Sequence, residues 1–150
     1  MAAGVEIRAV GRNERADWEQ LWRRFQSFHR FTVSDETIEV TWERFQDPAE
    51  PMFLLGAYAD GALVGIVQFV FHRSCTTIGD FCLLHNLFVA DEARGSGIGR
   101  ALIEAVYAAA TRHGASRVHW NVLESNATAR VLYDKVAQRS GFVQYRKSLG

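Results

Sequence analysis

The chain has 150 residues, with 17 basic and 17 acidic side chains, 48% hydrophobic residues and 2 prolines. This length and composition describe one compact globular domain over residues 1–150, and they exclude a disordered, collagenous or fibrous protein. The formal net charge of zero removes the broad electrostatic attraction by which basic proteins bind nucleic acids. We therefore expect no nucleic-acid partner, and any anionic ligand must be held locally.

The two cysteines, Cys75 and Cys82, lie seven residues apart, and no Cys/His spacing resembles a zinc site. We expect free thiols in a reducing compartment and no metal. The N-terminal stretch 1–10 has no basic region followed by a long apolar run, and no window reaches 18 uncharged apolar residues. We therefore expect a cytoplasmic protein without a membrane segment.

The first third of the chain is predicted to form one strand and two helices. Alternation of apolar and polar residues over 5–10 indicates a half-buried strand, and Asn13 is expected to cap the helix that follows. Ser34 begins a second helix, which ends before Pro48. The first helix has an aromatic face that we interpret mainly as core packing: Trp18, Leu21, Trp22, Phe25 and Phe28.

Three β-type runs are expected to form strands next: 52–59, 62–72 and 81–90. The sequence Asp60-Gly61 between the first two is typical of a tight hairpin turn. The remaining elements are predicted as a helix over 97–113, a strand over 117–122, a helix over 126–136 and a final strand over 142–147. A meander followed by two strand–helix–strand units predicts a mixed α/β fold whose sheet is partly antiparallel and partly parallel.

A glycine-rich segment, Arg94-Gly95-Ser96-Gly97-Ile98-Gly99-Arg100, stands between the third of these strands and its helix. Alternate glycines permit backbone conformations and close approaches that side chains forbid. A helix that starts here directs free N–H groups and its positive dipole end at one point, which suits a pyrophosphate. The arginines at the two ends of the segment add charge-assisted hydrogen bonds. Arg100 stands where a dinucleotide fingerprint needs glycine, and the Gly-Lys-Ser/Thr of a Walker loop is absent.

The pattern Arg94-x-x-Gly97-x-Gly99, placed after an apolar strand and opening a helix, resembles the coenzyme A pyrophosphate motif of the GCN5-related N-acetyltransferases, the GNAT superfamily. The resemblance covers nearly the whole chain and extends to a subgroup that includes yeast histone and polyamine acetyltransferases, which residues 132–142 resemble. It implies a central mixed, mostly antiparallel sheet flanked by helices. Splayed central strands would then form an acetyl-CoA cleft.

The resemblance also implies which residues hold acetyl-CoA. Pantetheine would pair with the backbone of 87–89 like an added strand, and a backbone N–H of Phe88 or Leu87 would reach the thioester oxygen. Tyr133 is implied to serve the departing sulfur, as general acid or as a hydrogen-bond donor to the thiolate. The implied cofactor-binding residues are Leu87, Phe88, Val89, Arg94, Gly95, Ser96, Gly97, Ile98, Gly99, Arg100, Asn126 and Tyr133.

The acceptor amine must lose a proton before it attacks, because a lysine-like amine with a pKa of about 10.4 is almost entirely charged at pH 7. The sequence leaves the base open between water and side chains on several elements: Asp80, His85, His119, Glu124 and His29. Asn86 stands where related subgroup sequences tend to carry an acidic residue. This departure weakens the case for a base on the same strand.

The acceptor stays open as a small amine, an amino acid, a polyamine or a protein lysine. Residues 25–32 and Trp42 belong to the region that forms the acceptor wall in this family. The aromatic cluster Phe28, His29 and Phe31 fits either helix packing or cation–π contact with an alkyl-ammonium. A homodimer is expected from family habit, with 142–148 as an edge that pairs between subunits.

Three rival hypotheses stay open. A covalent acetyl-cysteine route would use Cys82, although no activating cation is evident beside it in the sequence. A non-catalytic acyl-CoA sensor or interaction module would keep the cofactor cleft without consuming acetyl groups. A nucleotide-binding protein would use the same glycine-rich segment for ATP or NAD.

Overall fold

A single sheet forms the centre of the computed structural model, which describes residues 4–150; the first three residues of the N-terminal stretch lie outside it. Within these residues the sheet has five strands in chain order: β1 (Val5–Ala9), β2 (Met52–Ala59), β3 (Ala62–His72), β4 (Phe81–Val89) and β5 (Arg117–His119). Neighbouring strands are antiparallel except β4 and β5, which are parallel. This arrangement confirms the predicted mixed, mostly antiparallel sheet.

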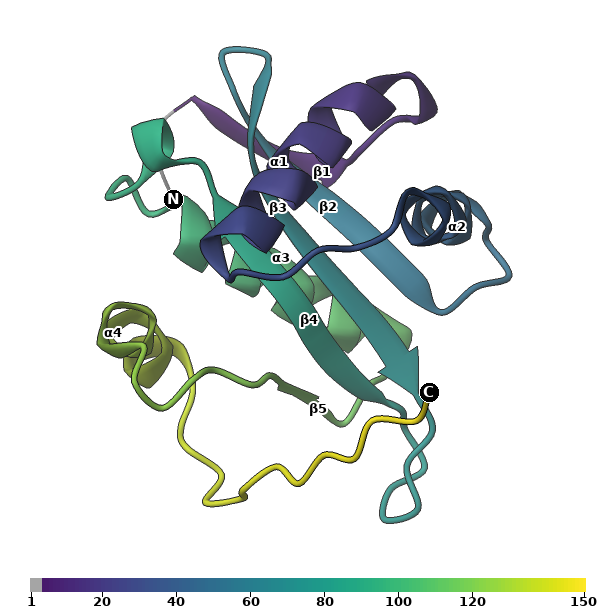
Figure 1. The fold of residues 1–150 in the computed structure, drawn as a ribbon. Coiled ribbons are helices and arrows are strands. Elements are labelled where there is room, and N and C mark those ends of the chain that lie inside the picture. The colour runs from purple at the N-terminus through teal and green to yellow at the C-terminus, as the bar shows by residue number, and fades with distance from the viewer. Residues whose placement is uncertain (1–3) are drawn as a thin grey trace.

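Helices cover both faces of the sheet (Figure 1). They are α1 (Arg15–Phe28), α2 (Asp35–Gln46), α3 (Ile98–His113) and α4 (Ala127–Val136), with short 3-10 turns η1 (Arg12–Glu14) and η2 (Asp91–Ala93). α1 and α2 enclose one part of the hydrophobic core and α3 encloses the other. None of the helices within 4–150 is long and apolar enough to cross a membrane.

Local signals explain most of the element boundaries. The Ser34 hydroxyl accepts a hydrogen bond from the Thr37 N–H at 3.1 Å and begins α2. Asp60 and Gly61 both have positive φ, as the two-residue turn between β2 and β3 requires. Gly114, with φ 84°, ends α3 in the left-handed conformation.

Three details of the predicted fold are wrong. Asn13 does not cap α1 but lies inside η1, because the Glu14 carboxylate accepts the Gly11 N–H at 2.8 Å and closes that turn. The strand predicted over 117–122 ends at His119, where its pairing with β4 stops. The segment predicted as a strand over 142–147 is an exposed coil, since the short β5 offers it no extended edge to pair with. Within residues 4–150 the sheet therefore has one parallel pair of strands, β4 and β5.

β4 carries a bulge in its middle. Asn86 pairs with Gln68 and Leu84 pairs with Phe69, so His85 is an extra residue without an opposite partner on β3. Regular alternation would put Leu84 and Phe88 on the same face of the sheet. Instead, Leu84 packs in the core under α3 and Phe88 packs in the core under α1 and α2. Because of the bulge, even-numbered side chains before His85 and after it therefore point to opposite faces of the sheet.

Candidate active site

Beyond Leu83 the outer edge of β4 is open. β5 pairs with β4 only through residues 81–83, after which its chain turns away toward α4 (Figure 1). Within residues 4–150, the segment 84–89 therefore has a strand partner on the β3 side alone. The stretch 87–89 lies on this edge, where an extended ligand can add itself as a further strand. The splayed central strands are confirmed.

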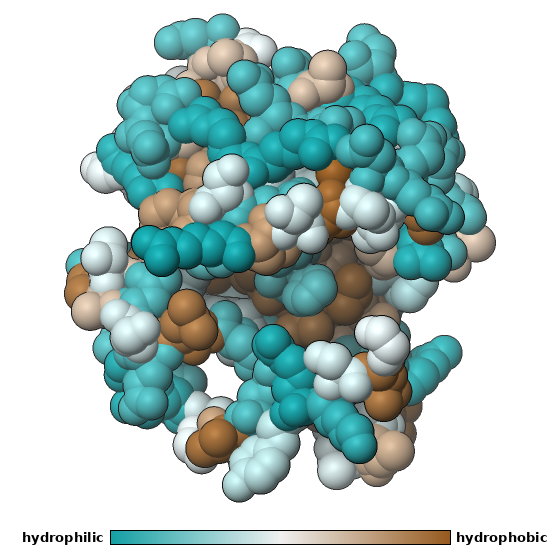
Figure 2. Space-filling model, viewed as in Figure 1, coloured by the Kyte–Doolittle hydropathy of each residue, from teal (hydrophilic) through white to brown (hydrophobic). Residues whose placement is uncertain are grey.

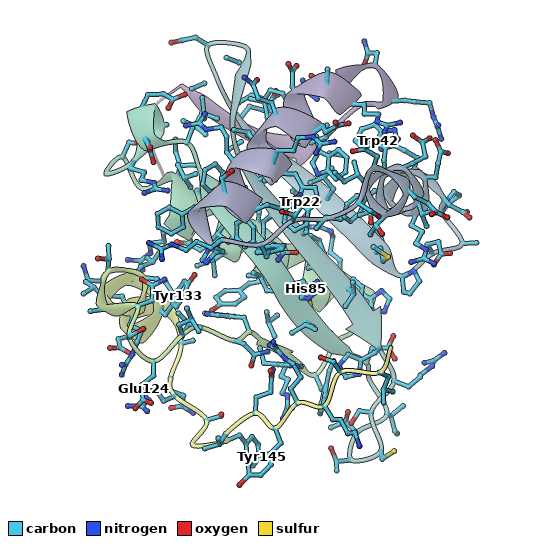
Figure 3. The ribbon with its side chains drawn as sticks, in the orientation of Figure 1. Trp22, Trp42, His85, Glu124, Tyr133 and Tyr145 are labelled. Atoms are coloured by element: carbon cyan, nitrogen blue, oxygen red, sulfur yellow. The ribbon has the colours of Figure 1, made fainter. Side chains whose placement is uncertain are left out.

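A hollow lies between the connection from α1 to α2 and the segment that joins β5 to α4 (Figure 2). Its floor is largely hydrophobic, with a polar side chain near the centre. His85, at the bulge of β4, lies on this floor, and Tyr133 stands across from it on α4 (Figure 3). The hollow thus lies where β4 and β5 separate.

The glycine-rich segment turns sharply at the start of α3. Gly95 and Gly97 have φ values of 82° and 83°, which glycine adopts without the strain that a side chain brings. A methyl group added at either position would meet no atom within 4 Å, so space beside the loop is open. Gly97 is the N-cap of α3 and provides no side-chain cap. The first N–H groups of the helix are therefore available to an anion.

Two contacts hold this loop in place. The Ser96 hydroxyl donates to the Ala93 carbonyl at 2.7 Å. Gly99 faces α4, because a methyl group there would lie 3.4 Å from a side-chain carbon of Leu132. This is an ordinary van der Waals distance, so the start of α3 packs against α4 at this position. The loop and the helix that carries Tyr133 are thereby positioned together.

The two arginines at the ends of the loop have different surroundings. Arg94 donates from Nε to the Val89 carbonyl at 3.0 Å, and its terminal nitrogen lies 3.2 Å from an oxygen of Asp91. Arg100 donates to Glu104 at 3.0 Å, one turn along an exposed face of α3. Each guanidinium has further N–H groups for a phosphate. Arg94 also fastens the end of β4 to the loop.

Tyr133 and Asn126 lie on the same helix but have different contacts. The Tyr133 ring packs edge-on against Trp120 at a centroid distance of 5.4 Å, and burial raises the pKa of its hydroxyl. Asn126 is the N-cap of α4, where its Oδ1 accepts the Ala129 N–H at 3.2 Å. The raised pKa makes Tyr133 a weaker acid. Hydrogen-bond donation to a thiolate is therefore favoured over complete proton transfer.

Three of the candidate bases lie around the splayed strands. His85 is exposed on the floor of the hollow (Figure 3). His119 ends β5, its Nδ1 is buried without a partner within residues 4–150, and burial with nearby Arg117 lowers its pKa. Glu124 is exposed, and its side chain points away from the hollow (Figure 3). His85 is thus the most accessible of the three from the hollow.

The other two candidate bases are held elsewhere. Asp80 precedes β4 and lies 3.0 Å from a ring nitrogen of His113 and 3.2 Å from Arg73. The hydrogen bond from His113 and the charge of Arg73 lower the pKa of Asp80, which makes it a weaker base. His29 follows α1, where its ring lies 4.4 Å from that of Phe25 and partial burial lowers its pKa.

The aromatic residues proposed for the acceptor wall divide into core and surface. Trp42 is buried and its ring lies 5.2 Å from that of Trp18, so its side chain packs between α1 and α2. Phe28 is exposed, and the cation over its ring is Arg94, at 5.3 Å. Phe31 packs edge-on against side chains of α1. Packing accounts for most of this cluster.

Cys82 has poor surroundings for a covalent route. It is fully buried under α3, in the part of β4 that has a strand on each side. Burial raises the pKa of its thiol to about 11, so the thiolate is scarce at neutral pH. Cys75 is exposed in the loop between β3 and β4, and both cysteines are free thiols.

Sequence reasoning missed a series of side-chain hydrogen bonds in the layer between α1 and the sheet. Trp18 Nε1 donates to Gln68 Oε1 at 2.8 Å, and Gln68 Nε2 donates to Asn86 Oδ1 at 3.0 Å. Gln68 is buried in the middle of an otherwise apolar strand. That interruption was the available signal, because a buried amide needs hydrogen-bond partners. The bulge at His85 had no comparable signal.

Comparisons with known proteins show the family to which the fold belongs. The model of the acetyltransferase (GNAT) family matches residues 18–137. D-amino-acid N-acetyltransferase HPA3 of Saccharomyces cerevisiae is 29% identical over 148 residues, covering 96% of this chain and 91% of the yeast protein. Uncharacterized N-acetyltransferase YhfO of Bacillus subtilis is 25% identical over 143 residues, 94% of this chain and 95% of that protein.

Solved structures share the fold at lower sequence identity. A ribosomal-protein-alanine N-acetyltransferase from Brucella melitensis has 22% identity and a TM-score of 0.80, with 97% of this chain and 99% of that chain covered. The aminoglycoside N-acetyltransferase AAC(6')-Iy in complex with CoA has 18% identity and a TM-score of 0.81, with 96% and 94% covered. The fold of this chain is therefore one that such structures also have.

Proposed function

The chain belongs to the acetyltransferase (GNAT) family and is an N-acetyltransferase, and we propose that it transfers the acetyl group of acetyl-CoA to a primary amine by direct attack in a ternary complex. The observation that carries this mechanism is the open edge of β4 at 84–89, which leads into the glycine-rich loop at 94–100. A strand edge followed by an anion site suits a ligand that has an amide-bearing arm and a pyrophosphate. Acetyl-CoA supplies the activated acetyl group.

The residues present fit this ligand. The free N–H groups at the start of α3, with Arg94 and Arg100, would bind the pyrophosphate, and Asn126 would support the cofactor arm. The backbone of 87–89 would bind the pantetheine amides. A backbone N–H of Leu87 or Phe88 would polarise the thioester carbonyl, and in other enzymes the loss of one such donor costs about 3 kcal/mol.

Two side chains would assist the reaction, one by accepting a proton and one by donating a hydrogen bond. We propose His85 as the base that takes the proton from the acceptor amine, since it is exposed on the floor of the hollow and is freed from the strand ladder by the bulge. Tyr133 would donate a hydrogen bond to the departing thiolate. No step assigned to these residues calls for a metal ion.

The acceptor class in this proposal is a primary amine: a small amine, an amino acid, a polyamine or a protein lysine. The yeast relative is named for acetylation of D-amino acids, which puts amino acids among the first acceptors to test. The fold neighbours named for aminoglycosides and for a ribosomal protein share only the fold with this chain. We also propose that the enzyme works in the cytoplasm.

We propose a homodimer in which the C-terminal segment 142–149 of each copy, called the tail below, packs against the other copy. Four large apolar side chains of the tail, Phe142, Val143, Tyr145 and Leu149, are between 79% and 94% exposed. Exposed apolar side chains that gather in one segment mark an interaction surface. Sedimentation equilibrium should give about twice the chain mass of 16.9 kDa, and Tyr145→Asp should shift the mass toward one chain. A monomer at all concentrations would refute this arrangement.

A thermal-shift series tests the proposed cofactor. Acetyl-CoA and CoA at about 100 times their dissociation constants should raise the melting temperature by roughly 5 to 10 °C, since such binding adds about 2.7 kcal/mol. ATP and NAD should not. An assay of CoA release over amino acids, diamines, polyamines and peptides then tests the reaction. The proposal fails if acetyl-CoA gives no shift, and binding without acetyl consumption would favour the acyl-CoA sensor.

A further inference from the structure

α1 carries three N–H donors along one buried stripe. Trp18, Trp22 and Gln26 follow at four-residue spacing and are all buried. The Trp18 indole donates to Gln68, but Trp22 Nε1 and Gln26 Nε2 have no hydrogen-bond partner within residues 4–150. Trp22 is 7% exposed and Gln26 is 4% exposed. A buried donor left without a partner costs about 1–3 kcal/mol, so two on neighbouring turns call for an explanation.

A further donor lies on β4, next to His85. An indole N–H can only donate, so Gln68 must accept from Trp18 with its oxygen and donate onward with its nitrogen. Asn86 therefore accepts with Oδ1, and its Nδ2 is left as a donor. Asn86 is half-buried and faces the layer that contains α1. The hydrogen-bond chain thus sets the orientation of an amide beside the bulge.

These donors lie in the layer between α1 and the sheet, on the same side of β4. The last turns of α1 and its connection to α2 cross above β4, along the rim of the hollow (Figures 1 and 2). Gln26 Oε1 accepts the Val33 N–H at 3.0 Å, so this connection folds over Gln26 and must shift to admit a ligand. Arg30, at its start, has φ 59°, a strained value for a side chain other than glycine. The donors of this layer, on Trp22, Gln26 and Asn86, are all uncharged.

We propose that Trp22, Gln26 and Asn86 bind a carboxylate of the acceptor, so that the enzyme acetylates α-amino acids in preference to polyamines. A carboxylate offers two oxygens and about four acceptor positions, whereas the second ammonium of a polyamine would meet further donors. This inference rests on the proposed N-acetyltransferase reaction. In that reaction the amine nitrogen bonds to the acetyl carbon, the carbon–sulfur bond breaks, the base takes the amine proton, and CoA leaves as the thiolate and is protonated.

Matched pairs of acceptors test the inference. Phenylalanine and leucine, each as the D and L forms, are compared with their decarboxylated amines, phenethylamine and isopentylamine, and with spermidine. We expect kcat/KM for an amino acid to exceed that of its decarboxylated amine by about tenfold or more, the usual value of hydrogen bonds to a charged group. Equal or better turnover of the amines or spermidine overturns the inference and leaves the proposed reaction standing. If no acceptor releases CoA, the proposed reaction itself fails.

Two substitutions separate recognition from folding. Asn86→Asp keeps the oxygen that accepts from Gln68 but replaces the free donor with a carboxylate oxygen, so the ratio of kcat/KM for amino acid over amine should fall by about a hundredfold. Trp22→Phe keeps an aromatic ring without the N–H and should lower the same ratio by about tenfold, mainly through KM of the amino acid. Asn13→Asp, at an exposed position, is the matched control and should leave the ratio unchanged.

A thermal shift with CoA checks that each variant is folded and still binds the cofactor. Equal losses on amino acid and amine in both variants would show that Trp22 and Asn86 serve only the fold. That outcome overturns the inference, because the loss of a carboxylate contact would lower the activity on the amino acid alone.

Discussion

The two halves of β4 have opposite surroundings. Residues 81–83 have β3 on one side and β5 on the other, whereas 84–89 have only β3 within the described chain. Cys82 in the first half is fully buried, and its thiol has a pKa raised to about 11. His85 at the start of the second half is exposed. The first half of β4 is therefore enclosed in the sheet, whereas the second half has an open edge and an accessible histidine.

Two irregularities separate these halves within a few residues. The last pair between β4 and β5 joins Leu83 to His119, and the bulge follows at His85. The end of the pairing exposes the backbone edge that an extended ligand needs. The bulge turns Asn86 toward α1 and frees His85 from the regular ladder. The candidate site thus depends on where regular pairing stops, and substitutions in the two halves should have different effects.

The largest effect is expected at the bulge. His85→Gln should lower kcat/KM for an amine acceptor about 100-fold or more at pH 7, since a general base contributes at least that much. The rate of the variant should keep rising with pH, because deprotonation of the amine itself then limits the reaction. His119→Gln is the matched control and should retain most of the activity. The assignment would be reversed if His119→Gln lost activity and His85→Gln kept it.

A smaller effect is expected at Tyr133, on the other side of the hollow from His85. Tyr133→Phe should lower kcat about 10- to 100-fold and leave KM for acetyl-CoA nearly unchanged, since the hydroxyl acts on the departing sulfur. Tyr107→Phe provides a matched control, because its hydroxyl donates to the Val136 carbonyl at 2.8 Å and burial also raises its pKa. That variant should lose about 1 kcal/mol of stability and keep its kcat. Unchanged turnover in Tyr133→Phe would remove this residue from the mechanism.

Sequence reasoning found the features that depend on neighbouring residues. The hairpin at Asp60-Gly61, the cap at Ser34 and the turn at Gly97 each have a conformational cause within a few residues. The glycine-rich loop was placed correctly before α3 for the same reason. The family resemblance then supplied the splayed strands, which local patterns alone do not contain.

The features that depend on distant partners were harder to predict. A run such as 142–147 has the composition of a strand, but a strand requires an edge, and β5 ends after three residues. The bulge at His85 is a choice of register between β3 and β4, to which the hydrophobic pattern of β4 alone gives no guide. The base stayed open because Asp80, His85 and His119 look equivalent until their partners are known.

The smallest effect on activity is expected in the closed half of β4. Cys82→Ala should leave kcat and both KM values unchanged, because a buried thiol with a pKa of about 11 cannot supply a thiolate nucleophile at neutral pH. The substitution should still cost about 1 to 2 kcal/mol in urea unfolding, since it leaves a small cavity beneath α3. Cys75→Ala, at an exposed position, should change neither measurement. A loss of turnover in folded Cys82→Ala would restore the acetyl-cysteine route and move the chemistry into the closed half of the strand.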